Sequence, residues 1–249
     1  MSKKAVGIDI GGTGIKGALV NTKAGELRSE RIKLGTPEGG EPEAIAEVVR
    51  EIAAAVDDKP ERALGICFPA VVKHGITQSA ANVSDRWIGL DADELFSNTL
   101  NRHVHVINDA DAAGIAEVKF GAGRKRSGLT VMTTLGTGIG SALFYNGVLI
   151  PNAELGHLEI DGVDYETRAS FAAMERDSLS FEEWAERLQI YYLTLEKLFT
   201  PDLFIVGGGV SKSHEQFLPL LKLKTEIVPA ALQNSAGIIG AAALAYASE

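Results

Sequence analysis

The sequence predicts an α/β protein built from two similar lobes. Residues 6–33 read as strand, glycine-rich turn, strand, turn and strand, and residues 129–150 repeat that order. Each glycine-rich turn contains Gly-Thr-Gly, at residues 12–14 and 136–138. Elsewhere short apolar strands alternate with segments of helical periodicity, which is typical of α/β folds. Two lobes that each present such a tip suggest a phosphate chain held between them.

The composition is that of a globular chain with enough apolar residues for a sizeable core. Its 249 residues, 45% of them hydrophobic, suit one large domain or two lobes of roughly 100–150 residues. A net charge of −9 argues against bulk affinity for nucleic acid or membranes, but it allows a local anion site. Cys67 is the only cysteine, so an intrachain disulfide is excluded and a reducing cytoplasm is expected. The apolar run 236–247 is too short to span a bilayer, and we expect no signal peptide.

The first lobe continues from its hairpin as alternating strands and helices. Its clearest helix covers residues 43–56, where Ile45, Val49 and Ile52 recur at helical spacing. The predicted elements are strands at 6–10, 15–21 and 26–33, a helix at 43–56, a strand at 64–68, a loop or edge strand at 76–82, a helix at 93–102 and a strand at 104–107.

The second lobe contains the second hairpin and a long helix. Ser180 and Glu183 form a capping box that opens this helix, which runs to Phe199 and stops at Pro201. The other predicted elements are helices at 111–118, 213–221 and 236–247 and strands at 129–135, 141–145, 148–150 and 203–206. We expect an N-terminal lobe at 1–108, a C-terminal lobe at 109–235, and a terminal helix at 236–249 that packs back on the first lobe.

The first glycine-rich turn has the residue types of a phosphate loop. Glycine has no Cβ, so such a turn brings several N–H groups close to a phosphate, and a lysine adds a point charge. The residues concerned are Gly11, Gly12, Thr13, Gly14 and Lys16. Asp9 ends the preceding strand, where it could hold Mg²⁺ directly or through water.

Two nucleotide-binding motifs are similar to this turn but do not fit it. Gly12-x-Gly14-x-x-Gly17 matches the dinucleotide fingerprint, but that fingerprint requires a helix after the turn, and residues 15–21 read as a strand. The spacing of a Walker phosphate loop, which is Gly, four residues and then Gly-Lys-Ser/Thr, is absent as well. Taken alone, the stretch fits an ordinary structural hairpin equally well, and its recurrence in the second lobe favours a phosphate loop.

Three further stretches are candidates for binding the phosphoryl donor. Gly136, Thr137 and Gly138 form the second phosphate loop. The basic cluster Arg124–Arg126 leads into it, although a solvated turn is the alternative. Gly207, Gly208 and Gly209 follow a buried strand and could approach a ribose or adenine, or simply form a tight strand-to-helix turn.

The pair Asn108-Asp109 follows a predicted central strand, at the edge where open α/β sheets place ligands. A carboxylate there can orient and deprotonate a hydroxyl nucleophile. The alternative is a helix cap before Asp111, and both roles can hold at once.

Acids and one histidine gather in residues 152–159, where they could bind sugar hydroxyls. Glu154 and His157 are the main candidates there, Glu166 is another nearby, and Glu159 is as well explained as a solvated edge residue. Zinc is not expected, because it needs more ligands and the chain has one thiol. Asn82 lies in the polar stretch 79–86 and could reach the cleft between the two predicted lobes.

Taken together, these residues resemble the ROK family of sugar kinases, in the superfamily of actin, hexokinase and the chaperone ATPases. The resemblance covers the whole chain and rests on Asp9–Gly14, Gly65-x-x-x-Pro69, Asn108-Asp109, Leu135–Gly138 and Glu154-x-Gly156-His157. It implies an actin-like, ribonuclease H-like fold of two duplicated lobes around a cleft. It also implies that Asp109 is the general base for the sugar hydroxyl, and that Asn108, Glu154, His157 and Glu166 bind the sugar.

The chain departs from most of that family because it lacks their cysteine-rich zinc motif. The lack of this motif is a feature that the chain shares with the polyphosphate glucokinase and glucomannokinase subgroup. Three stretches of the sequence also resemble that subgroup, at residues 149–152, 204–211 and 227–234. The resemblance implies a Mg²⁺-dependent cytoplasmic enzyme that transfers phosphate from inorganic polyphosphate or ATP to the 6-hydroxyl of glucose, and also of mannose. No nucleic acid or membrane partner is expected, and a homodimer is left open.

Three other functions are compatible with parts of this sequence. A strictly ATP-dependent hexokinase would share the fold and most motifs. A sugar-sensing ROK regulator would need a DNA-binding domain before the first strand, which starts near residue 4. A filament or chaperone ATPase lobe would not need the acidic loop around Glu154.

Overall fold

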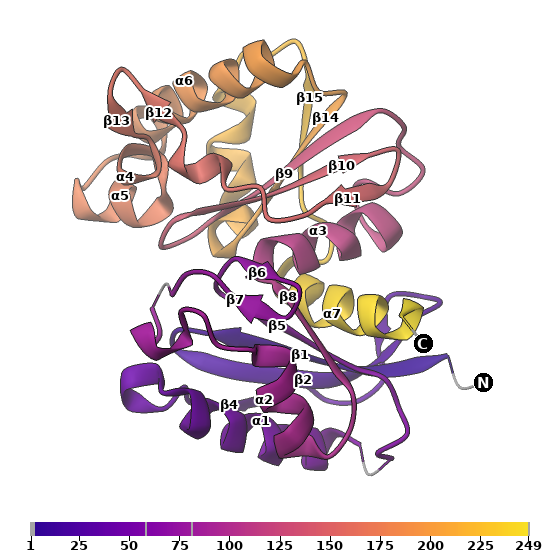
Figure 1. Cartoon of the computed structure of the whole chain (residues 1–249). Helices are drawn as coiled ribbons and strands as arrows, with labels where there is room; N and C mark the ends of the chain where they lie inside the picture. The colour runs from indigo at the N-terminus through magenta and orange to yellow at the C-terminus, as the bar shows by residue number, and fades with distance from the viewer. Residues whose placement is uncertain (1–2, 58, 81, 249) are drawn as a thin grey trace. The chain divides into compact units, whose positions relative to one another are not determined.

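The structure is a computed structural model that describes residues 3–57, 59–80 and 82–248. The chain divides into two compact units: unit 1 comprises residues 1–116 with 235–249, and unit 2 comprises residues 117–234 (Figure 1). The division falls inside helix α3, Asp109–Phe120, and helix α7, Ala236–Ala247, belongs to unit 1. Among the described residues, no helix combines the length and apolar character that a membrane span requires.

Unit 1 is organised around a mixed sheet in which β1 is central. Strand β1 pairs antiparallel with β2 and parallel with β5, and β5 pairs parallel with β8. The order is β3-β2-β1-β5-β8, with β4 also on β2. The strands are β1 Lys4–Gly11, β2 Gly14–Asn21, β3 Glu26–Leu27, β4 Ile32–Leu34, β5 Leu64–Phe68 and β8 Val104–Asn108, with a separate hairpin of β6 Val72–Lys73 and β7 Ile76–Thr77. The parallel pairing brings the carboxyl ends of β1, β5 and β8 to one edge.

Helices cover both faces of this sheet (Figure 1). Helix α7 packs so closely that a Cβ on Gly7 would lie 1.9 Å from the Ile238 carbonyl oxygen, and one on Gly65 would lie 2.0 Å from that of Ala241. On the opposite face, a Cβ on Gly17 would lie 2.5 Å from a side-chain carbon of Ile52 in α1. The helices here are α1 Pro42–Val56, α2 Ala92–Leu100 and α7, with 3₁₀ turns at Glu38–Gly40 and Asp85–Trp87.

The core of unit 1 is aliphatic near the hairpin and aromatic near β5. Ile8, Ile10 and Ile15 are fully buried. Trp87 packs between Phe68 and Phe96, at ring separations of 4.4 and 5.8 Å, and its indole N–H donates to the Gly40 carbonyl at 2.9 Å. The base of the first hairpin is therefore part of a well-buried core.

Unit 2 repeats the arrangement around β9. Strands β9, β10 and β11 are antiparallel, and β14 pairs parallel with both β9 and β15. The order is β11-β10-β9-β14-β15. The strands are β9 Leu129–Leu135, β10 Ile139–Tyr145, β11 Val148–Ile150, β14 Leu203–Gly207 and β15 Glu226–Pro229, with a small hairpin of β12 Glu159–Ile160 and β13 Val163–Asp164.

The long helix α6, Phe181–Phe199, carries much of the core of unit 2. Its capping box is formed as the sequence predicts, with Ser180 and Glu183 bonded reciprocally. Its inner face buries Trp184, Tyr191 and Tyr192. The shorter helices are α4 Glu166–Ala169 and α5 Phe171–Arg176, with 3₁₀ segments at Leu155–His157, Gly209–Gln216, Leu218–Leu220 and Gln233–Ser235.

Two predicted elements differ in detail. The strand expected at 26–33 is split into β3 and β4, because the Ser29 hydroxyl accepts the Leu19 N–H at 3.0 Å and so replaces strand pairing at that point. The helix expected at 213–221 is a pair of 3₁₀ segments, and Pro219, which lacks an N–H, lies in the second.

Candidate active site

The first glycine-rich turn is the tip of the β1–β2 hairpin. Gly11 faces Gly14 in the register, so Gly12 and Thr13 form a two-residue exposed turn with a strand, not a helix, after it. This confirms the predicted hairpin and excludes the dinucleotide fingerprint, because its helix is absent. The Thr36 hydroxyl donates to the Gly11 carbonyl at 2.5 Å and holds one side of the turn.

The structure brings Asn82 to this turn. A Cβ on Gly12 would lie 3.1 Å from the Cβ of Asn82, so the two backbones approach closely. Asn82 itself has a positive φ of 62°, a conformation that Asn tolerates better than most residues. The predicted ligand-binding residue therefore lies beside the first phosphate loop.

Lys33 on β4 is a cation of this loop that the sequence did not reveal. Lys33 faces Lys16 across the β2–β4 pair, and its side chain crosses Gly14, where a Cβ would lie 2.7 Å from Cε and 3.7 Å from Nζ. Lys16, in contrast, directs its ammonium group to Asp9, with Nζ 3.5 Å from Oδ2. Only the strand register shows that Lys33 reaches the turn, and register cannot be read from one isolated strand.

Asp9 is held from three sides at the carboxyl edge of the sheet. The Cys67 thiol donates to its Oδ1 at 3.4 Å, and Lys16 contacts its Oδ2. The first turn of α7 covers the pair, since a Cβ on Gly237 would lie 3.0 Å from the Cys67 sulfur and 3.5 Å from the Asp9 Cγ. The N-terminal turn of α7 therefore lies directly against the Asp9 carboxyl group.

Asn108 and Asp109 take different positions at the end of β8. Asn108 is buried: its amide donates to the Ala70 carbonyl at 3.1 Å, and its oxygen accepts the Asp111 N–H at 3.0 Å. Asp109 begins α3, is exposed, and accepts the Ala110 N–H at 2.8 Å. The capping bond to Asp111 is thus made by Asn108, and the Asp109 carboxylate lies at the surface of unit 1.

Asp9 and Asp109 belong to one electrostatic cluster. Burial, followed by the charges of Asp9 and Asp109, raises the pKa of the Cys67 thiol well above its usual range. The thiol is therefore a neutral donor next to the carboxylates. The sheet edge of unit 1 assembles Asp9, Cys67, Asn108 and Asp109 as the parallel strand ends predict.

The second glycine-rich turn, between β9 and β10, is supported by Glu166. The Ile139 N–H donates to the Glu166 Oε2 at 2.8 Å, and a Cβ on Gly138 would lie 2.4 Å from the same oxygen. Thr137 is exposed at the tip, and the Gly136 N–H donates to the Gly138 carbonyl at 3.0 Å. Glu166, a predicted sugar ligand, therefore also supports the predicted phosphate loop.

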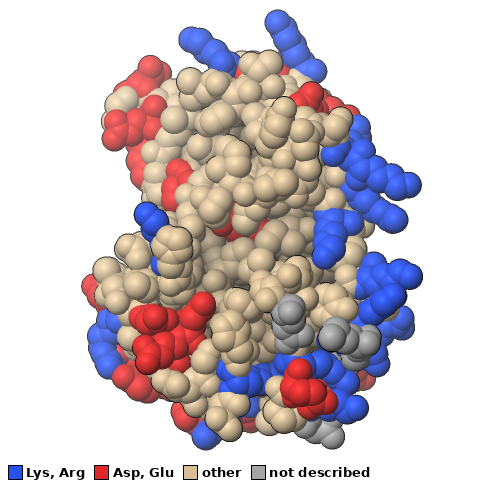
Figure 2. Space-filling model, turned by 45° about the vertical axis from the view of Figure 1, so that its right-hand side comes forward, with Lys and Arg blue, Asp and Glu red and all other residues tan. Residues whose placement is uncertain are grey.

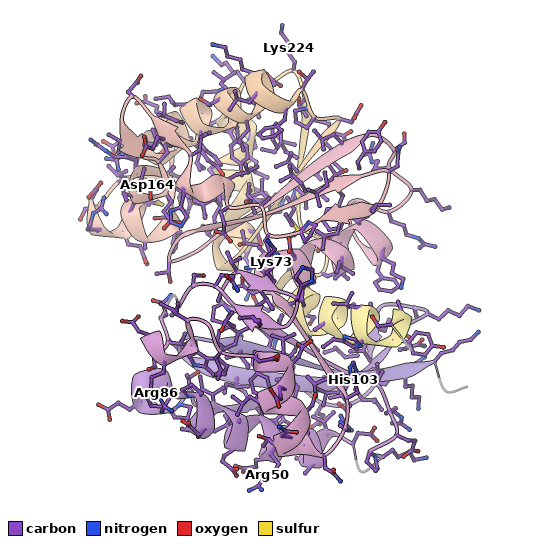
Figure 3. The ribbon with its side chains drawn as sticks, in the orientation of Figure 1. Arg50, Lys73, Arg86, His103, Asp164 and Lys224 are labelled. Carbon is purple, nitrogen blue, oxygen red and sulfur yellow. The ribbon has the colours of Figure 1, made fainter. Side chains whose placement is uncertain are left out.

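Glu154, His157 and Glu166 come together beside that loop. His157 Nδ1 lies 2.8 Å from Asp164 Oδ2 and 4.0 Å from Glu166 Oε1. The bond to Asp164 raises the pKa of His157, against partial burial, and nearby carboxylates add to the effect. Partial burial of its carboxyl group raises the pKa of Glu154. Asp164 (labelled in Figure 3) was missed because only the β12–β13 hairpin brings it to His157.

The loop that carries these residues is fixed to β10. The Leu155 N–H donates to the Ser141 hydroxyl at 2.8 Å, and a Cβ on Gly156 would lie 2.1 Å from the Ile139 carbonyl oxygen. Glycine is therefore required in Glu154-x-Gly156-His157. Glu159 is exposed on β12, opposite Asp164 in the register.

The run Gly207–Gly209 lies against the second loop. Gly208 has a φ of 87°, and a Cβ there would lie 2.2 Å from the Leu135 carbonyl oxygen. Gly209 has no atom within 4 Å of such a Cβ, so one side of the run is open. Close contacts explain why glycine is needed at positions 207 and 208. At Gly209 the position of a Cβ is open, so a ligand could approach the backbone there.

The basic cluster Arg124–Arg126 is in an exposed turn after α3. Arg126 pairs with Glu226 at 2.7 Å, and both side chains are about half exposed. Lys125 adopts a positive φ of 63°. One of the three charges is thus partly compensated within unit 2.

The fold and these two glycine-loop sites define an actin-like protein of the sugar kinase type. A family model described as the ROK family matches residues 5–176, and the chain belongs to this family. It is 46% identical over 240 residues to the polyphosphate glucokinase of Mycobacterium leprae, covering 96% of this chain and 74% of that protein. It is 45% identical over 237 residues to the polyphosphate glucokinase of Mycobacterium tuberculosis strain H37Rv, covering 95% of this chain and 89% of the other.

Solved structures give the same result. The inorganic polyphosphate/ATP-glucomannokinase from Arthrobacter sp. strain KM is 50% identical, with a TM-score of 0.94 over 99% of both chains. A ROK family glucokinase from Streptomyces griseus, in complex with glucose and AMPPNP, is 25% identical, with a TM-score of 0.83 over 98% of this chain and 99% of that one.

Proposed function

We propose that this protein is a glucokinase that transfers a phosphoryl group from inorganic polyphosphate or ATP to the 6-hydroxyl of glucose. The observation that carries this proposal is the 50% identity over 99% of both chains to a polyphosphate/ATP-glucomannokinase. The two glycine hairpins support it independently, because each presents backbone amides and neither contains groups that read a base.

We assign sugar binding to two sets of residues. In unit 1 these are Asn82, Asn108 and Asp109, and in unit 2 they are Glu154, His157 and Glu166. Carboxylates and an imidazole can each accept or donate a hydrogen bond to a sugar hydroxyl. Such contacts adapt to either epimer at the 2-hydroxyl, so we propose that mannose is accepted as well, less readily than glucose.

Asp109 is the proposed general base. Its carboxylate takes the proton from the 6-hydroxyl while that oxygen attacks the terminal phosphorus, and the bond to the bridging oxygen breaks. The leaving group is a polyphosphate shorter by one unit, or ADP. Asp109 suits this role because it is exposed, begins α3 and lies at the sheet edge where ligands of α/β proteins bind.

The donor phosphates are assigned to the two glycine-rich turns and their lysines. Gly11, Gly12, Thr13 and Gly14 with Lys16 and Lys33 would bind phosphate in unit 1, and Gly136, Thr137 and Gly138 in unit 2. The open side of Gly207–Gly209 is the proposed contact for the nucleoside of ATP. Arg124–Arg126 would add positive charge for a longer chain.

Asp9 is the proposed ligand of Mg²⁺. Its carboxylate is partly exposed, at 21%, and its protein contacts of 3.4 and 3.5 Å are long, so its oxygens can still bind a cation or its waters. Mg²⁺ commonly uses one or two carboxylates together with substrate phosphates. When bound, the ion would offset negative charge on the donor phosphates.

The proposal is tested by crossing donors with sugars. Purified protein is assayed for glucose 6-phosphate in nucleotide-free buffer with Mg²⁺ and long-chain polyphosphate, and separately with ATP; mannose replaces glucose in parallel. We expect product with both donors and both sugars. Turnover with ATP alone would make the protein a strictly ATP-dependent hexokinase, and mannose that neither reacts nor inhibits would refute the broader sugar range.

A further inference from the structure

A basic hollow in unit 1 lies apart from every residue assigned above. Its volume is about 360 Å³, and its lining consists of Lys3, Lys4, Asn21, Lys23 and Arg28. Four of these five side chains are cationic, in a chain whose net charge is −9. Figure 2 shows Lys and Arg side chains gathered along the right-hand side of the view. The wall of the hollow consists mainly of the carbon atoms of these side chains. Positive charge gathered around a hollow attracts anions.

The sequence folds locally so that cations from three segments converge there. Lys4 begins β1 opposite Asn21, the last residue of β2, and the Thr22 N–H donates to the Lys3 carbonyl at 3.0 Å. The Asn21 side chain accepts the Lys23 N–H at 3.1 Å and so fixes the following turn. After that turn, the Arg28 N–H donates to the Leu19 carbonyl at 2.6 Å. The backbone is therefore ordered beneath side chains that extend into solvent.

The positive charge of the hollow is poorly compensated within the described residues. Arg28 contacts Glu26 at 3.9 Å, and both side chains are about half exposed or more, at 48% and 64%. An exposed pair at this distance contributes little. Lys3, Lys4 and Lys23 take part in no ion pair between described residues. A bound anion would relieve the mutual repulsion of these groups.

The chemistry of the lining favours inorganic polyphosphate over other polyanions. Its residues include no aromatic side chain on which a nucleic acid base could stack. Four flexible cations around an open hollow suit several successive phosphates without fixed geometry. A single phosphate would occupy only a part of it.

The hollow lies at the opposite end of the β1–β2 hairpin from the phosphate loop. Strand β1 has 8 residues between Lys4 and Gly11, so the two ends are about 25 Å apart at roughly 3.3 Å per residue. Between them, the segment 26–34 follows β2 and carries the exposed cations Arg31 and Lys33. Only a long chain could contact both ends at once.

We propose that this basic hollow is a second polyphosphate site, which binds the distal part of a long chain while its end is used at the glycine loop. This inference rests on the proposed use of polyphosphate as donor. It predicts that long chains bind more tightly than short ones because they engage both sites, which raises the effective concentration at each.

The test neutralises the hollow and compares donors of different length. The variant combines Lys4→Gln, Lys23→Gln and Arg28→Gln, all at exposed positions, and the single variant Lys23→Gln serves if the triple variant misfolds. The matched control is Arg50→Gln, Lys222→Gln and Lys224→Gln, which removes the same charge from exposed residues elsewhere (Arg50 and Lys224 are labelled in Figure 3). Calorimetric Kd values are measured for long-chain polyphosphate and tripolyphosphate without glucose, and KM values for both and for ATP.

We expect the triple variant to weaken the binding of long-chain polyphosphate by about tenfold or more. The slope of log Kd against log salt concentration should fall by about 2, because three contacts to a flexible polyanion are lost. Its KM for tripolyphosphate and ATP, and kcat with every donor, should match the control. Equal long-chain Kd values in variant and control, or no binding by the wild type, would overturn the inference. If long-chain polyphosphate binds, the triple variant weakens that binding and no glucose 6-phosphate forms from polyphosphate, the result would support the basic hollow as a binding site and refute polyphosphate as donor.

Discussion

At the scale of single residues, the proposed mechanism depends most on Asp109. Asp109→Asn keeps the shape and the bond from the Ala110 N–H but removes the proton acceptor. We expect kcat to fall by about 10²–10⁴-fold, the usual range for a lost acid or base, while the KM for glucose changes little. Steady-state kinetics with saturating donor measure both. A variant that retains more than a tenth of wild-type kcat would reduce Asp109 to a structural role at the start of α3.

Lys33 allows a second test at the first phosphate loop. Its ammonium lies beside Gly14, whereas Lys16 is engaged with Asp9, so Lys33→Gln removes the less compensated charge at the turn. We expect the KM for polyphosphate and ATP to rise by about tenfold, equal to about 1.4 kcal/mol, in low salt, and by less as salt screens the contact. Lys222→Gln, an exposed lysine of unit 2, is the control. Equal KM values in the two variants would remove Lys33 from the site.

His157 provides a prediction about pH. Its pKa is raised above 6.5, first by the bond to Asp164, so the ion pair is fully formed below about pH 6.5 and is lost as pH rises through the folded-state value. We expect Asp164→Asn to return the His157 pKa toward 6.5, measured by NMR titration of the imidazole, and Glu159→Gln to change it less. The side chain is 56% exposed, so the effect on stability should be small. An unchanged His157 pKa in Asp164→Asn would contradict the assigned cause.

Motifs and tertiary neighbours differ in how well the sequence reveals them. Asp9, Asn108, Asp109, Glu154 and His157 could be named because each belongs to a short pattern at a strand end or in a loop. Lys33 and Asp164 could not be named as candidates, because their positions depend on which strand pairs with β2 and on a small hairpin. Residue type and local spacing carry the first kind of information, and register carries the second.

At the scale of elements, the contact of α7 with the central sheet can be tested through its glycines. Gly7→Ala would place a Cβ 1.9 Å from the Ile238 carbonyl oxygen, so the helix must move away from β1. We expect the free energy of unfolding in urea to fall by at least about 2 kcal/mol, since overpacking against backbone cannot relax by a rotamer change. Gly35→Ala, with no atom within 4 Å, should stay within about 1 kcal/mol of wild type. Equal stability of the two variants would mean that α7 is not held at this distance.

The elements that could be predicted are those with strong local signals. Both glycine hairpins, the capped helix α6 and helix α1 follow from turn residues, a capping box and periodicity. The hydrophobic pattern predicted the wrong element in two places. Between β3 and β4 the Ser29 side chain replaces backbone pairing, and near residue 219 a proline prevents a regular helix. Between β3 and β4 the outcome depends on a single hydrogen bond, from the Leu19 N–H to the Ser29 hydroxyl.

At the scale of the whole molecule, the duplicated hairpin was the strongest indication of the fold. Each hairpin belongs to a separate mixed sheet with its own buried core. This core includes Ile8 and Ile10 in unit 1, and Tyr192 and Phe204 in unit 2. The assignment of α7 to unit 1 could not be derived from periodicity, because this helix is apolar on every side. It follows from the glycines of β1 and β5, which let the helix approach.

The absence of a cysteine-rich zinc motif leads to a prediction about metal dependence. Cys67 is buried with its thiol on Asp9, and no group of three or more His, Cys, Asp or Glu within the described residues is arranged to hold a metal ion. Stability should therefore not depend on a structural metal, whereas turnover should depend on Mg²⁺ bound with the donor phosphates. After EDTA treatment and dialysis, we expect an unchanged midpoint of thermal unfolding, no turnover, and full recovery on addition of Mg²⁺. Elemental analysis is the control, and one equivalent of zinc per chain, with activity lost on its removal, would refute this prediction.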